Sequence, residues 1–97
     1  ADAQILGGVT EFMKVAALAQ AYDLPVAPHG NQDVHVHLVA AIPNGLIVEY
    51  YAGHTDPMWG KSFKEHLKVK DGFVQPPDRP GFGIELNEEA LEPHRVA

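Results

Sequence analysis

The segment Pro25-Val26-Ala27-Pro28-His29 decides the fold. Val26 and Ala27 form a short apolar run between two prolines, which is typical of a buried parallel strand because such strands carry few polar side chains. His29 ends this run, and Gly30 then begins a polar turn. Enzymes with α/β folds place acids and bases at the carboxyl ends of their buried strands. His29 is therefore the first candidate functional residue.

An amphipathic helix is predicted upstream of this strand. Over residues 11–22, apolar side chains recur at three- and four-residue steps, which places them on one face of a helix. These side chains are Phe12, Val15, Ala16, Leu18, Ala19 and Tyr22. Gly7-Gly8 supplies a tight turn before the helix, and the helix is expected to stop near Asp23. Ahead of the glycines, we expect Ala3 to Leu6 to be an extended apolar segment.

A second helix and a second strand are predicted downstream. Asn31 to Ala41 has helical periodicity, and Pro43-Asn44-Gly45 is expected to end it. Leu46-Ile47-Val48 then opens another apolar strand, which Glu49 interrupts. A carboxylate inside such a run needs a partner or a function. The alternation of strand, helix, strand, helix and strand predicts a parallel α/β architecture.

The chain changes character after Tyr51. A loop leads there to two short alternating runs around Asp71-Gly72, and this dipeptide is a strong hairpin signal. Asn87 begins a sequence with the cap chemistry of a brief final helix. The expected organisation is thus a first region of residues 1–51 and a tail of residues 52–97.

Composition excludes several classes of protein. Seven Lys and Arg against thirteen Asp and Glu give a net charge of -6, which repels nucleic acid and anionic lipid, so neither is expected as a partner. Without cysteine there is neither a disulfide framework nor a thiolate zinc site. No apolar run approaches the roughly 20 residues that span a bilayer. The start does not have the pattern of a secretory signal, so a cytoplasmic location is expected.

Taken in order, these segments resemble the carboxyl-terminal portion of the mandelate racemase/muconate lactonizing enzyme family of the enolase superfamily. The resemblance rests on Asp2, Gly7-Gly8-Val9-Thr10-Glu11, Pro25-Val26-Ala27-Pro28-His29, His37-Leu38-Val39-Ala40-Ala41, Glu49 and Pro76-Pro77-Asp78-Arg79-Pro80-Gly81-Phe82-Gly83-Ile84. It implies part of a (β/α)₈ (TIM) barrel: the end of strand 6, a helix, strand 7, a helix and strand 8. A hairpin-containing tail follows, expected to pack on the barrel and the capping region.

The resemblance also implies a reaction and three site residues. Family members use Mg²⁺ and remove a proton α to a carboxylate, which gives racemases, cycloisomerases and acid-sugar dehydratases that act on small carboxylates. His29 matches the dyad histidine, suited to act as the base. Asp2 matches the dyad aspartate, which would receive the other ring N–H of the histidine. Glu49 matches a glutamate on strand 8, which burial would keep protonated as a donor to the substrate carboxylate.

A complete barrel usually needs about 250 residues, so the chain is expected to be a fragment of a larger enzyme. The family's metal ligands and lysine base come from earlier strands. We therefore expect this chain to be inactive and without a cofactor on its own, with Mg²⁺ held in the parent enzyme. The alternative is a noncatalytic α/β domain that self-associates into a homo-oligomer, because an open piece of barrel exposes strand edges and apolar surface.

The remaining histidines suggest a weaker hypothesis, that the chain is a small protein that binds a metal ion through histidines. His35 and His37 suggest a metal site, but residues two apart on a helix point to different faces. We expect ordinary packing and surface roles for this pair. His54, His66 and His94 lack supporting partners in the sequence.

Overall fold

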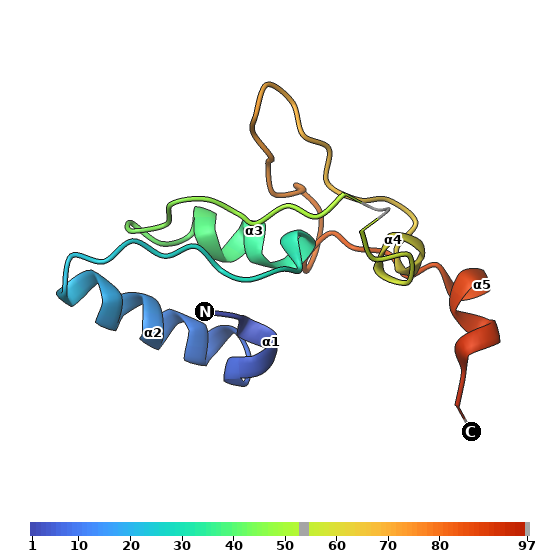
Figure 1. Cartoon of the computed structure of the whole chain (residues 1–97), viewed down its shortest axis with the longest axis horizontal. Helices are drawn as coiled ribbons and strands as arrows, with labels where there is room; N and C mark the ends of the chain where they lie inside the picture. The colour runs from blue at the N-terminus through green and yellow to red at the C-terminus, as the bar shows by residue number, and fades with distance from the viewer. Residues whose placement is uncertain (53–54, 97) are drawn as a thin grey trace. The chain divides into compact units, whose positions relative to one another are not determined.

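The computed structural model describes residues 1–52 and 55–96. By its internal contacts the chain divides into two compact units, Ala1–Tyr50 and Tyr51–Ala97. The helices of the first unit are α1 (Ala3–Leu6), α2 (Val9–Ala21) and α3 (Gln32–Ala40) (Figure 1). Those of the second are α4 (Trp59–Ser62), α5 (Glu88–Leu91) and the 3₁₀ helix η1 (Glu92–His94). Within the described residues, no helix has the length and apolarity needed to cross a bilayer.

The segment from Ala3 to Leu6 is a single helical turn, so the prediction of an extended segment was wrong. The Asp2 side chain caps this turn by accepting a hydrogen bond from Gln4 N at 2.9 Å. Gly7 ends the turn in a left-handed conformation with φ of 97°. Four residues are too few to distinguish a strand from a helix, and the cap and the glycine decide the outcome.

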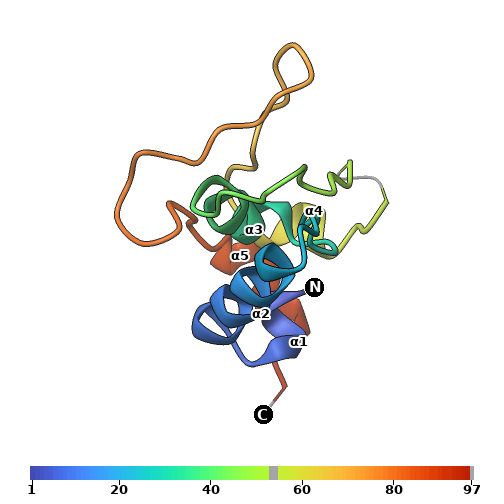
Figure 2. The same ribbon diagram turned by 90° about the vertical axis from the view of Figure 1, so that its left-hand side faces the viewer.

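Helix α2 confirms the predicted amphipathic helix and begins slightly earlier, at Val9. It lies beside α3 in both views of the chain (Figures 1 and 2). Phe12 and Ala16 are buried on it, whereas Leu18 and Tyr22 of the predicted stripe are exposed. The core of this unit comprises Ala3, Phe12, Ala16, Val26, Leu38 and Ile42.

One parallel bridge, between Val26 and Gly45, joins the first predicted strand to the glycine just before the second. Val26 N donates to Asn44 O at 2.8 Å, and Leu46 N donates to Val26 O at 2.9 Å. In the described residues the two segments meet only in this isolated bridge and neither forms a strand, so the predicted parallel strand arrangement stays a prediction. Leu46 and Ile47 are each 60% exposed. A parallel strand is normally buried on both faces, and this pair of segments alone does not provide that cover.

The second unit has a tight turn at Asp71-Gly72, where the hairpin was predicted, and a short helix, α5, where the final helix was predicted, but no strands flank the turn in the described residues. Lys70 and Phe73 exchange two backbone hydrogen bonds of 2.9 Å across Asp71-Gly72. Both turn residues have positive φ, 52° and 81°, as a type I′ turn requires. Asn87 caps α5 by accepting a hydrogen bond from Ala90 N at 3.3 Å.

Candidate functional site

His29 and Asp2 are in direct contact, although 27 residues separate them in the sequence. Nδ1 of His29 lies 3.3 Å from Oδ2 of Asp2. The backbone reinforces the contact, because His29 N donates to Ala1 O at 2.8 Å. The His29 side chain is 67% exposed and that of Asp2 only 11%. The imidazole is thus largely exposed to solvent, while the carboxylate beside it is largely covered.

Asp2 is held as an anion. Burial raises the pKa of its carboxyl group, but the hydrogen bond from Gln4 N lowers it. The hydrogen bond with His29 and the electrostatic interactions with His35 and His29 lower it further, and the net pKa is below its usual value. A carboxylate that accepts hydrogen bonds in its charged form stays ionised at neutral pH. Asp2 therefore presents a negative charge to the His29 ring.

Glu49 contacts the residue after His29 and so joins Asp2 and His29 in one cluster, which we call the His29 corner. Its Oε2 accepts a hydrogen bond from Gly30 N at 2.8 Å. The expected burial of Glu49 does not hold in this chain, where the residue is exposed. Asp2 thus contacts His29 by its side chain, and Glu49 contacts the adjacent backbone.

His35 is a buried member of this corner that the sequence did not connect with Asp2 and His29. It is 0% exposed on α3, and its Nδ1 lies 2.6 Å from Gly30 O. Its Nε2 accepts a hydrogen bond from Ala3 N at 3.0 Å and lies 3.5 Å from Oδ1 of Asp2. The packing role expected from the sequence is confirmed. No sequence signal reveals the bond to Ala3, because 32 residues separate the two partners.

The described residues lack a cluster of metal-binding side chains. They contain no group of three or more His, Cys, Asp or Glu that could hold a metal ion. His35 uses both ring nitrogens in contacts with the protein. The described residues therefore do not fit a Mg²⁺ site on their own.

The other histidines differ in their surroundings. The His66 ring packs against Trp59 with a centroid distance of 4.1 Å and a tilt of 40°, and its Nε2 lies 3.3 Å from Gly60 O. The prediction that His66 lacks partners was wrong, because helical turn α4 brings both residues to it. His94 is exposed in η1, and His54 lies outside the described residues.

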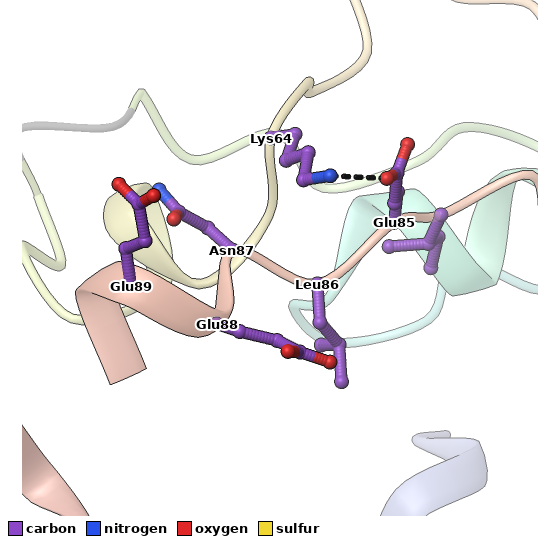
Figure 3. Close-up of a pocket in the computed structure, with 7 residues that line it drawn as sticks. Lys64, Glu85, Leu86, Asn87, Glu88 and Glu89 are labelled. Carbon is purple, nitrogen blue, oxygen red and sulfur yellow. Dashed lines mark hydrogen bonds and ion pairs between the residues drawn. The ribbon is translucent and has the colours of Figure 1, made fainter. Parts of the chain in front are cut away.

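The second unit has an open pocket of about 790 Å³ at the start of α5 (Figure 3). Lys64 points toward Glu85 in this pocket and forms an ion pair with it. The hydrogen bond with Glu85 raises the pKa of Lys64, and the same bond lowers the pKa of Glu85. A lysine held charged in this way is not available as a base at neutral pH. The pocket is therefore a weaker candidate than the His29 corner.

Comparison with known proteins identifies the class. Residues 1–90 match the family described as enolase C-terminal domain-like. The chain belongs to this family, and its structural neighbours are mandelate racemase/muconate lactonizing enzyme family members.

Two characterised relatives illustrate the sequence similarity. The chain is 38% identical over 90 residues to a 3,6-anhydro-α-L-galactonate cycloisomerase from Streptomyces coelicolor, covering 93% of this chain and 24% of the relative. It is 36% identical over 89 residues to an L-talarate/galactarate dehydratase from Salmonella typhimurium, covering 92% and 21%. The chain therefore spans about a quarter of the length of these relatives.

Two solved structures illustrate the similarity of fold. The L-talarate dehydratase from Polaromonas sp., in complex with Mg and L-glucarate, matches with a TM-score of 0.80 at 37% identity. The matched region covers 94% of this chain and 24% of the dehydratase chain. A mandelate racemase/muconate lactonizing enzyme from a marine actinobacterium, in complex with magnesium, gives 0.84 at 34% identity and covers 94% and 26%. The fold class is thus that of the enolase C-terminal domain.

Proposed function

We propose that this chain is the carboxyl-terminal part of a Mg²⁺-dependent enzyme that removes a proton α to a carboxylate. The favoured reaction is dehydration of a sugar acid, and racemisation is the alternative. The contact of 3.3 Å between His29 Nδ1 and Asp2 Oδ2 carries this proposal. Relatives named as sugar-acid dehydratases support the class of reaction.

In this proposal, residues 1–51 supply the end of strand 6 and all of strands 7 and 8 of a (β/α)₈ barrel. Residues 52–97 form the tail. The parallel bridge between Val26 and Gly45 supports the placement of their segments as neighbouring strands. The remaining strands would be supplied by residues outside this chain, since a full barrel takes about 250 residues.

The proposed chemistry of the chain is proton transfer. With Nδ1 of His29 directed at Asp2, Nε2 is the ring nitrogen that takes the α proton, and the electron pair of the broken C–H bond moves into the carboxylate as an ene-diolate. The negative Asp2 stabilises the imidazolium that forms and fixes the orientation of the ring. In dehydration, the same Nε2 proton then passes to the departing β-hydroxyl, which leaves as water. Glu49, if kept protonated by burial in the intact barrel, would donate a hydrogen bond to the substrate carboxylate.

Mg²⁺, when bound in the parent enzyme, would offset the charge of the ene-diolate. Its ligands would lie on residues outside this chain, because the described residues offer no metal-holding group.

A chimera tests the proposal. The carboxyl-terminal part of the Salmonella L-talarate/galactarate dehydratase is replaced by this chain, with which it aligns over 89 residues. Dehydration of talarate and galactarate is then measured with Mg²⁺. We expect an active chimera, no turnover by the 97-residue chain alone, and a loss of roughly 10²–10⁴-fold on His29→Asn, the usual contribution of a general base.

Retention of activity by the His29→Asn chimera would overturn the assignment. Exchange of the substrate α proton in D₂O gives a second readout, because it reports proton removal even where the later loss of water is slow. Should the chimera not fold, the truncated dehydratase and this chain are mixed as separate chains. Absence of both turnover and exchange in a folded chimera or assembled pair would also contradict the proposal.

A second candidate function is a noncatalytic domain that self-associates. The 60% exposure of Leu46 and Ile47 favours it, because exposed apolar strand residues invite pairing. Light scattering distinguishes the two candidates. A monomer that unfolds cooperatively at all concentrations would exclude self-association of the chain.

A further inference from the structure

His35 connects the backbone on either side of the proposed acid–base pair. It accepts a hydrogen bond from Ala3 N, the residue after Asp2, at 3.0 Å. Its other nitrogen lies 2.6 Å from the carbonyl oxygen of Gly30, the residue after His29. One buried ring therefore spans two segments that each carry a member of the pair.

The partners of His35 fix its protonation state. The Gly30 carbonyl can only accept a hydrogen bond, so Nδ1 carries the proton. The Ala3 amide can only donate, so Nε2 carries a lone pair. The ring is therefore neutral and in the Nδ1–H tautomer, and a second proton on Nε2 would face the Ala3 N–H. Asp2 Oδ1 lies farther from Nε2, at 3.5 Å, than Ala3 N does, at 3.0 Å, so the Ala3 amide is the hydrogen-bond partner of Nε2.

Gly30 is held on both sides as a result. Its N–H donates to Oε2 of Glu49 at 2.8 Å, and its C=O accepts from His35. The φ of Gly30 is 58°, a left-handed conformation that fixes the direction in which the chain leaves His29. Phe12 stacks on the His35 ring with a centroid distance of 6.0 Å and limits its movement. His29 therefore precedes a backbone unit that hydrogen bonds immobilise.

We propose that His35 is the positioning residue for the Asp2–His29 pair, acting through Ala3 and Gly30. This inference rests on the proposed function of that pair. Such a residue touches no substrate, and its effect is to keep the His29 and Asp2 side chains at contact distance. Positional errors of about 1 Å in such a pair are enough to reduce catalysis severely.

The tautomer is tested in the 97-residue chain by long-range ¹H–¹⁵N NMR of the histidine rings at pH 7–8. We expect His35 to be neutral with its proton on Nδ1. A proton on Nε2, or a charged ring, would overturn the inference without bearing on the role of His29.

Variants test the positioning. His35→Phe keeps the ring but removes both hydrogen bonds, whereas Asn retains a donor in place of Nδ1 and Gln an acceptor in place of Nε2. The nuclear Overhauser contact between the His29 ring and the Asp2 β protons should disappear in His35→Phe and persist, weakened, in His35→Asn and His35→Gln. His37→Asn on the same helix is the control and should leave it unchanged. A wild-type contact in a folded His35→Phe chain would refute the positioning role. Should His35→Phe not fold, an unchanged contact between His29 and Asp2 in both His35→Asn and His35→Gln would refute the positioning role.

The chimera supplies the catalytic readout. We expect His35→Phe to lower kcat by at least about tenfold with KM nearly unchanged, and His35→Asn to restore part of kcat. Equal loss in both variants, matching their loss of thermal stability, would indicate packing alone and overturn the inference. An active His29→Asn chimera would instead defeat the proposed function, while the NMR result on His35 would stand.

Discussion

The amide of Gly30 donates its hydrogen bond to the Glu49 carboxylate at 2.8 Å, across 19 residues of sequence. This contact ties the turn after His29 to the segment that follows the Val26–Gly45 bridge. Gly30 is buried, so its N–H has little access to water as a substitute partner. The carboxylate of Glu49 therefore has a structural consequence whether or not substrate is present.

Glu49→Ala should expose the Gly30 amide to exchange. The loss of a hydrogen bond to a charged acceptor at an exposed side chain is worth about 1 kcal/mol, which corresponds to roughly fivefold faster exchange. Amide hydrogen exchange followed by NMR measures it. Glu49→Gln keeps an acceptor oxygen, so its Gly30 exchange rate should lie between those of wild type and Glu49→Ala. Glu11→Ala is the control, since Glu11 pairs with Lys14 on the surface of α2. Equal Gly30 exchange in wild type and Glu49→Ala would contradict the contact.

The lowered pKa of Asp2 makes the stability of the chain depend on pH. A carboxyl group with a depressed pKa in the folded state stabilises that state above its unfolded pKa, here near 3.8, and loses this contribution as pH falls through the folded value. Asp2→Asn retains an acceptor for Gln4 N but has no titrating charge. Between pH 5 and pH 2, wild type should lose more unfolding free energy than the variant in urea titrations. Asp23→Asn is the control: it removes a charge at an exposed residue, and its unfolding free energy should change with pH as that of wild type does. Parallel pH curves for wild type and Asp2→Asn would disprove the linkage.

The length of each sequence pattern explains which parts of the fold were predictable. Helix α2 has 13 residues, enough for its apolar repeat to be distinguished from a strand. The Asp71-Gly72 turn was also predictable, because the two positive φ values that it needs favour these residue types. The four residues of α1 carry no usable period, and the predicted strands depend on neighbours that local sequence does not encode.

Some residues of the candidate site could likewise be predicted from the sequence and others could not. His29 was found from its place after a short apolar strand, and its contact with Asp2 followed from the family resemblance. His35 was not predicted, because its two partners, Ala3 and Gly30, contribute only backbone atoms. Any residue type except proline supplies an N–H and all supply a C=O, so such partners leave no trace in the sequence.

Asn44 hydrogen-bonds both to α2 and to the segment that follows this helix. Its Nδ2 donates to Ala16 O at 3.1 Å and to Leu24 O at 3.0 Å. Asn44→Asp replaces this donor by a carboxylate oxygen that faces two carbonyls, so we expect a loss of about 1–3 kcal/mol in unfolding free energy at pH 7. Urea denaturation followed by circular dichroism measures it. The same substitution at Asn87 should cost little, because the Asn87 side chain accepts from Ala90 N and aspartate serves equally well in a helix cap. Similar losses in both variants would contradict the assigned roles.

Gly45 must be glycine because α3 leaves no room for a side chain there. A Cβ at this position would lie 2.4 Å from Val39 O and 3.0 Å from Val39 Cγ1. The carbonyl oxygen belongs to a helix backbone and cannot rotate away, so Gly45→Ala has to displace the bridge to Val26. We expect a loss of about 1–3 kcal/mol, with faster exchange of the Val26 amide, whose partner is Asn44 O. Gly72→Asn is the control: a Cβ there meets nothing within 4 Å, and asparagine tolerates the left-handed conformation of the turn. Unchanged Val26 exchange in Gly45→Ala would show that the bridge does not depend on this close approach.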